Sequence, residues 1–245
     1  MTDPAAPRAS EVLRARMTMC TGPLDAVFSR LWANENPREI VPAFLIMLHQ
    51  IMRASVPVME AAIRRLNEIG PADPLVPPLI EYYKHHLKEE RDHDVWALED
   101  LEAAGFDPAA VLRQMPPPPV ARLAGAQRYW VEHYHPITLL GCIMVLESFP
   151  PSTDVIDRIR DTSGLPEVAF RTFRLHGRVD PYHSAEVRDV IDRLPLTRPD
   201  VETIATSLMA CMESLTECIS ELQPIRFDRI AVLGPERDFV SSKRH

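Results

Sequence analysis

Glycine is scarce in this chain, and signals for β-structure are almost absent. The 245 residues include 8 glycines and 24 prolines, with no Asn-Gly hairpin turn and no run of alternating β-branched residues. Many prolines stand beside segments with helical periodicity, because proline is tolerated in a first helical turn and breaks a helix interior. We therefore expect an all-α protein, a single seven-helix bundle. The expected helices span residues 23–33, 37–69, 75–104, 119–148, 152–162, 166–194 and 198–222.

The chain also lacks any sign of a second domain. We find no internal repeat, and the proline run at residues 116–119 is too short for a domain linker and is expected to join two helices. A chain of this length can bury a sizeable core in one unit. We assign residues 1–20 to an N-terminal extension, 21–234 to the helical domain and 235–245 to a flexible tail.

Positive charge, a leader segment and paired cysteines are lacking as well. The net charge of −8 argues against binding to nucleic acid or to an anionic membrane, because both require a basic patch. The N-terminal residues lack the apolar core of a signal peptide, and no stretch approaches the roughly 18 apolar residues of a membrane helix. The cysteines contain no C-x-x-C pair. We expect a cytoplasmic protein with reduced thiols.

One expected helix, residues 166–194, carries polar residues in the middle of an apolar stripe. The stripe is apolar at both ends, so this face should be buried. Between the ends stand His176, Asp180 and His183, which steps of four and seven residues place within roughly 40° of one another around the helix. A buried carboxylate is costly without partners, and two imidazoles beside it are typical of a cation site. A hydrogen-bonded His-Asp-His network is the alternative.

Two other expected helices have similar interruptions. Glu90 occupies a position that the apolar stripe of residues 75–104 assigns to the core, and His93 lies one turn further on. In helical bundles, Glu-x-x-His is the spacing with which one helix supplies a carboxylate and an imidazole to a metal. Glu147 ends the strongly apolar segment 136–148, where a glutamate could instead reach water. We interpret Glu147 as a third contributor to the same site.

These residues together predict a metal centre. Imidazole and carboxylate donors without cysteine favour iron or manganese over structural zinc. Six ligands are too many for one ion that keeps an open position, and they suit two ions. Three carboxylates leave residual positive charge on two divalent ions, which favours an anionic ligand. The six candidate ligands are Glu90, His93, Glu147, His176, Asp180 and His183.

A ferritin-like carboxylate bundle is a competing interpretation. That class needs Glu-x-x-His on two helices, and the second match in this chain is Glu132 to His135. Pro136 disfavours helix at His135, so the pair straddles a break, and we disfavour this class. We interpret His85 and His86 as structural residues.

The order and spacing of these motifs resemble those of the haem-oxygenase-like diiron oxidases and oxygenases, iron-containing redox enzymes of the haem-oxygenase and thiaminase-II-like fold. The likeness spans roughly residues 75–190. It rests on Glu90-x-x-His93 within HLKEERDHDVWALEDLEAAG, Glu147 after YHPITLLG, and His176-x-x-x-Asp180-x-x-His183. The resemblance implies a seven-helix haem-oxygenase-like fold, a non-haem centre of two Fe ions and O2 as co-substrate.

The resemblance also implies the chemistry. Family reactions include N-oxygenation of amines and amino acids, which we slightly favour, and oxidative C–C cleavage of amino or fatty acids to alkenes. The expected substrate is a small amine, amino acid or carboxylic acid. The reaction is compatible with an external electron donor, and the chain with a homodimer. We expect neither nucleic acid nor membrane as a partner.

Carried over position by position, the resemblance makes the six candidates the iron ligands. Some family members have a further carboxylate ligand on an earlier helix, and Glu60 is the candidate here. Arg174, Arg128 and Tyr134 lie near ligand segments and are candidates for substrate binding. We interpret His49 as a core histidine.

The late ligand helix contains Gly177 and Pro181. Glycine is a weak helix former, and the proline lacks a backbone donor and opposes the carbonyl four residues back. We therefore hypothesise that His176 and Asp180 are mobile and that one iron binds weakly.

Two rival classes remain open. The metal-free thiaminase-II branch of the same fold uses a nucleophilic cysteine and a glutamate, and Cys142 would be that nucleophile here. This interpretation leaves His93, Asp180 and His183 unexplained. The other rival is a non-catalytic helical protein that binds metal or haem, for which one imidazole would suffice.

Overall fold

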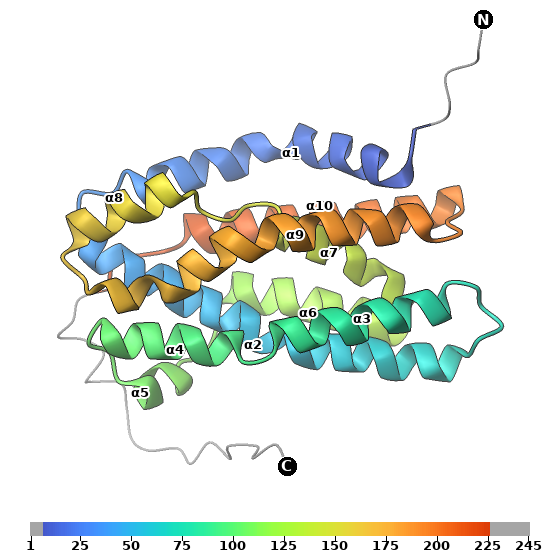
Figure 1. Cartoon of the computed structure of the whole chain (residues 1–245), viewed down its shortest axis with the longest axis horizontal. Coiled ribbons are helices and arrows are strands. Elements are labelled where there is room, and N and C mark those ends of the chain that lie inside the picture. The colour runs from blue at the N-terminus through green and yellow to red at the C-terminus, as the bar shows by residue number, and fades with distance from the viewer. Residues whose placement is uncertain (1–6, 226–245) are drawn as a thin grey trace, which may run out of the picture.

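The structure is a computed structural model, and it describes residues 7–225. Its long helices run roughly along one axis (Figure 1). No β-strand occurs within residues 7–225. The helices are α1 (Ala9–Trp32), α2 (Pro37–Ile69), α3 (Val76–Glu90), α4 (His93–Ala103), α5 (Pro108–Leu112), α6 (Pro118–His133), α7 (Leu139–Leu146), α8 (Thr153–Ser163), α9 (Arg171–Arg193) and α10 (Arg198–Ser220), with two short 3-10 segments, η1 (Pro136–Thr138) and η2 (Glu167–Phe170).

The central helix is α2, which packs against α3, α4 and α6. It stays one continuous helix through Pro42 and Pro57, and it buries long aliphatic side chains along most of its length. Among the described helices, α2 alone is long and apolar enough to cross a membrane by length and composition, but 72% of its most apolar window is buried inside the protein. Burial against its neighbours therefore accounts for its hydrophobicity.

The all-α class is confirmed, but the prediction of seven helices is wrong. The expected helix 75–104 is broken after Glu90, where Arg91 is extended and Asp92 adopts the left-handed conformation with φ of 70°. Aspartate tolerates this conformation better than most residues. The expected helix 119–148 is interrupted at Pro136, which cannot donate a backbone hydrogen bond and begins η1.

The N-terminal boundary also differs from the prediction. From Ala9 onward, the expected extension 1–20 is part of α1, which packs against α10 and α9. Both the backbone N–H and the hydroxyl of Ser10 donate to the Asp192 carboxylate of α9, at 2.9 and 2.7 Å. The predicted tail, 235–245, lies outside the described residues.

A close contact between α7 and α10 determines where α7 ends in the bundle. Gly141 of α7 lies against the backbone of α10, where a Cβ atom would come within 2.3 Å of the Ile204 carbonyl oxygen and 2.7 Å of the Leu208 nitrogen. Because only glycine fits this contact, α7 packs directly on α10 and ends with Glu147 inside the bundle.

Candidate metal centre

The structure brings the six sequence-predicted ligands together in one cluster between α3, α4, α7 and α9. Five of the six are buried, and His176 is partly exposed. Each carboxylate has an imidazole within about 3 Å, because Glu90 pairs with His93 at 3.2 Å, Glu147 with His183 at 3.2 Å, and Asp180 with His176 at 2.9 Å. The cluster therefore consists of three carboxylate–imidazole pairs from distant parts of the chain.

Glu90 and His93 lie on either side of a helix break. Glu90 is the last residue of α3 and His93 the first of α4, with the left-handed Asp92 between them. The His93 ring packs against Trp96 and meets the His176 ring edge-on, with ring centroids 5.0 Å apart in the latter pair. The break, rather than one continuous helical face, thus sets the positions of these two donors.

The pKa values of Glu147 and Glu90 are shifted in opposite directions. Burial, together with the charges of Glu90 and Asp180, raises the pKa of Glu147 to about 7. Burial also acts to raise the pKa of Glu90, but the neighbouring imidazoles, His93 foremost, outweigh it and lower this pKa to about 2. The hydrogen bond to Glu147 raises the pKa of His183 to about 9. A cation bound among these groups would remove the repulsion between the carboxylates.

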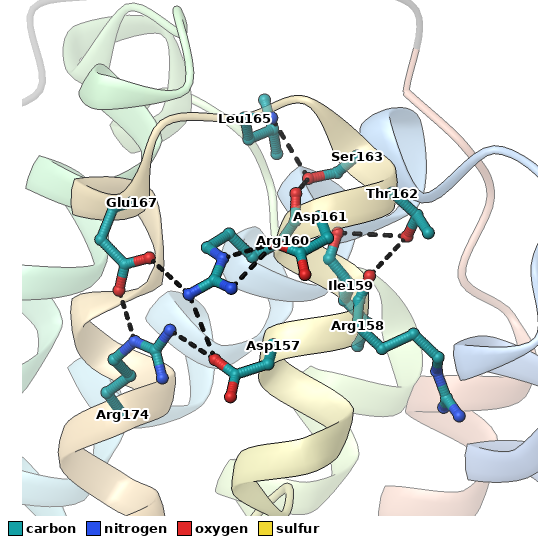
Figure 2. Close-up of polar contacts among 10 residues, drawn as sticks. All are labelled: Asp157, Arg158, Ile159, Arg160, Asp161, Thr162, Ser163, Leu165, Glu167 and Arg174. Carbon is teal, nitrogen blue, oxygen red and sulfur yellow. Dashed lines mark hydrogen bonds and ion pairs between the residues drawn. The ribbon is translucent and has the colours of Figure 1, made fainter.

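Two polar contacts fix the first turn of the ligand helix α9. The backbone N–H of Thr172 donates to the buried carboxylate of Asp100 on α4, at 2.7 Å. Arg174 donates to Asp157 of α8 at 2.8 Å and to Glu167 at 2.5 Å, and Figure 2 shows this network. The helix then continues without a break through Pro181. The mobility hypothesised for its ligands stays a prediction.

The donor atoms of the cluster fit cations. Within the described chain, four buried polar atoms have no hydrogen-bond partner here, three in the cluster and one on the adjacent His86, and an unsatisfied buried group costs roughly 1–3 kcal/mol. They are His86 Nδ1, Glu90 Oε1, His93 Nδ1 and His176 Nε2. Two buried groups each have donor atoms within 4.8 Å of one another, namely His86–Glu90–Glu147 and Glu147–Asp180–His183. Because Glu147 belongs to both groups, the arrangement fits two cations that share it.

A family model described as iron-containing redox enzyme matches residues 42–215. The chain belongs to this family. The matched segment contains all six candidate ligands, and the resemblance seen in the sequence is confirmed at the level of the family. A search of curated proteins found no match.

Solved structures confirm the haem-oxygenase-like fold of this iron-containing redox enzyme. A domain of unknown function with a haem oxygenase-like fold from Shewanella denitrificans OS217 is 17% identical, with a TM-score of 0.76, and the alignment covers 89% of this chain and 93% of that one. A TenA homologue from Pseudomonas syringae pv. tomato DC3000 is 8% identical, with a TM-score of 0.60 and coverages of 84% and 91%.

Two apolar cavities open onto the cluster of this iron-containing redox enzyme. The larger, of about 110 Å³, is walled by side chains such as Phe44 and Phe173, and the smaller, of about 50 Å³, by Leu123 and others. Glu90 and Glu147 line both cavities, so each cavity contacts the cluster directly. Among the residues described here, no lysine or arginine lines either cavity.

The remaining sequence-predicted residues lie away from the cluster. Arg128 pairs with Glu132 on the surface, Tyr134 is 60% exposed, and Arg174 belongs to the network that ties α9 to α8. Glu60 is half-buried on α2, outside the donor groups found among residues 7–225. None of these four lines either of the two cavities in the described structure.

Of the remaining histidines, His86 lies in a different environment from the one that we expected from the sequence. His49 is buried and its Nδ1 donates to the Asp94 carbonyl, which is a core position. His85 is exposed and faces Glu89 and Glu186. His86, however, is 2% exposed and lies at the cluster, one helical turn before Glu90. That four-residue spacing was the available signal.

Proposed function

We propose that this chain is a non-haem diiron enzyme that uses O2 to oxidise a small amine, amino acid or carboxylic acid. The position of Glu147 carries the proposal, because its carboxylate is shared by two buried groups of donor atoms. A shared carboxylate suits a pair of metal ions held close together.

The six candidate ligands would hold the two ions. Bound iron would supply the redox chemistry of O2 activation, which amino-acid side chains do not provide. Imidazole and carboxylate donors without cysteine suit iron. Against two divalent ions, the charge of three ligand carboxylates leaves a net positive centre, so the protein needs no arginine or lysine at the cluster to attract an anionic substrate group.

The protein itself would supply an apolar site for the substrate. The two cavities would receive the body of a substrate beside Glu90 and Glu147, and their largely apolar walls would limit the access of water to the cluster. Asp100 and Arg174 hold the first turn of α9 and thereby position His176, which follows directly.

Anaerobic titration with Fe(II), followed by mixing with O2 in a stopped-flow spectrometer, tests the proposal. We expect two Fe(II) per chain and a transient visible band that requires both. Product analysis with candidate substrates distinguishes N-oxygenation from oxidative C–C cleavage. Glu147→Gln should abolish binding of the second ion and the transient band, whereas Glu60→Gln, a matched change outside the cluster, should preserve both. A wild-type chain that binds no iron would contradict the proposal.

One observation favours a second candidate function, metal-free hydrolysis of the thiaminase-II type. Cys142 lines the smaller cavity together with Glu90 and Glu147, where a nucleophile and a carboxylate could act on one substrate. Its Sγ lies 3.1 Å from the Sγ of Cys211. Activity without iron that is lost in Cys142→Ala would support this candidate, and iron-dependent oxidation retained in Cys142→Ala would exclude it.

The proposed enzyme would work in the cytoplasm, where its four cysteines, all free in this structure, stay reduced. An external electron donor would provide the reducing equivalents.

A further inference from the structure

His86 lies deep in the protein next to the candidate metal centre. Its ring stacks on Tyr82, with centroids 5.6 Å apart, and meets the His183 ring edge-on at 5.1 Å. Its Nδ1 is buried and has no hydrogen-bond partner in the part of the chain that the structure describes. A structural histidine of the core is expected to use at least one ring nitrogen, as His49 does through Nδ1 although its Nε2 has no partner. Neither ring nitrogen of His86 takes part in a hydrogen bond within residues 7–225.

The surroundings of His86 repeat those of His183. Each imidazole lies between the same two carboxylates, Glu147 on one side and Glu89 on the other. For His183, Nδ1 lies 3.2 Å from Glu147 and Nε2 lies 3.5 Å from Glu89. For His86, Nε2 lies 3.7 Å from Glu147 and Nδ1 lies 4.0 Å from Glu89. Histidine ligands of metals commonly have a carboxylate near their second ring nitrogen. Glu89 lies on that side of both rings, although its 4.0 Å separation from His86 Nδ1 is longer than a hydrogen bond.

The two oxygens of Glu147 face different rings. Oε1 is the atom nearest to His86, and Oε2 is the atom nearest to His183. The 3.7 Å separation of His86 Nε2 from Oε1 is too long for a hydrogen bond. Two donors that each lie ~2.1 Å from one ion are at most ~4.2 Å apart, so this separation allows both atoms to bind the same ion.

We propose that His86 is a seventh ligand of the metal centre and binds through Nε2 the ion that Glu90 and Glu147 hold, with Glu89 on the outer side of the His86 and His183 rings. This inference rests on the proposed function. It raises the number of imidazoles at the two ions to four, namely His86, His93, His176 and His183. His86 and Glu90 lie on α3 and Glu147 lies at the end of α7, so the ion would join these two helices.

Cobalt substitution tests the assignment directly. The full chain is stripped of metal with a chelator and reloaded with Co(II) under anaerobic conditions. In the proton NMR spectrum, each imidazole bound to Co(II) gives one strongly shifted, exchangeable ring N–H signal. We expect four such signals in the wild type and three in His86→Gln. Losing a carboxylate that only contacts a metal ligand typically lowers the metal affinity by about tenfold or more, and losing the ligand itself should cost at least as much. The second Co(II) should therefore bind at least about tenfold more weakly in His86→Gln.

Two variants serve as controls. His85→Gln changes the exposed neighbour and should keep four signals and the wild-type Co(II) affinity. Glu89→Gln should keep four signals while the second Co(II) binds more weakly, since Glu89 contacts the rings and not the ion. Circular dichroism confirms that each variant is folded.

The outcomes separate this inference from the proposed function. Three signals in a wild-type chain that binds two Co(II) would overturn the role of His86 and leave the diiron proposal standing. The same follows if His86→Gln binds two Co(II) with wild-type affinity. A wild-type chain that binds no Co(II) or Fe(II) would overturn both, and this result does not depend on the folding of any variant.

Discussion

Replacing Gly141 by alanine should destabilise the protein through a contact between α7 and α10. The added Cβ would lie 2.3 Å from the Ile204 carbonyl oxygen and 2.7 Å from the Leu208 nitrogen. Both are backbone atoms of α10, so rotation of a side chain cannot relieve the overlap and the two helices must separate. Forcing extra atoms into a packed core costs roughly 1–3 kcal/mol, and rigid backbone neighbours place this case at the upper end.

The helix propensity of alanine offsets part of this loss. Alanine exceeds glycine by about 1 kcal/mol in a helix interior, so we expect a net loss of about 2 kcal/mol in the free energy of unfolding. For a chain of this size, that corresponds to a fall of roughly 4–8 °C in the Tm. The separation would also displace Glu147 at the end of α7 and weaken metal binding.

Gly125→Ala is the matched control. Gly125 lies inside α6, and no described atom would come within 4 Å of its added Cβ. The same substitution should therefore raise the Tm by roughly 2–4 °C, through helix propensity alone. Calorimetry of the metal-free variants measures both changes. The reasoning would be refuted by a Gly141→Ala variant that melts at or above the wild-type temperature while Gly125→Ala behaves as expected.

Two further predictions concern buried polar residues. Asp100→Leu should lower the free energy of unfolding by roughly 1–3 kcal/mol in urea titrations, because it leaves the Thr172 N–H without its acceptor, whereas Asp100→Asn keeps an acceptor and should cost less. An equal loss in both variants would contradict this role of the carboxylate oxygen. Burial lowers the pKa of His49 below its ordinary 6.5, so the unfolded state binds more protons and the stability contributed by His49 is lost as the pH falls below that value. His49→Gln should therefore flatten the acid side of the stability–pH profile, and a profile parallel to the wild type would contradict the assignment.

The apolar stripe of α9 shows what helical periodicity can predict. His176, Asp180 and His183 interrupt a stripe that is apolar at both ends, and the structure places Asp180 and His183 in one donor group and His176 beside Asp180. The rule works because a long helix packed on a core must bury a continuous face, so polar residues on that face must find partners.

Other features depend on contacts that a pattern along the chain does not contain. The break at Asp92 separates two helices that each pack against α2, and nothing in the local sequence marks its position. Arg174 lies two residues before the ligand His176 in the sequence, but its side chain pairs with Asp157 of α8 and Glu167 of η2. The four-residue spacing of His86 from Glu90 does not by itself separate a donor from a core histidine, and the position of Glu147, 61 residues later, adds the contact that places His86 in a buried donor group.

The break between α3 and α4 makes the two halves of the centre mechanically separable. Glu90 belongs to α3 and His93 to α4, so each would move with its own helix. An extended residue, Arg91, and a left-handed residue, Asp92, connect the two helices. A tilt of α4 would carry His93 away from His176 while Glu90 stays beside His183 and Glu147. In the proposed metal centre, such a tilt would move one imidazole donor and leave Glu90, Glu147 and His183 in place.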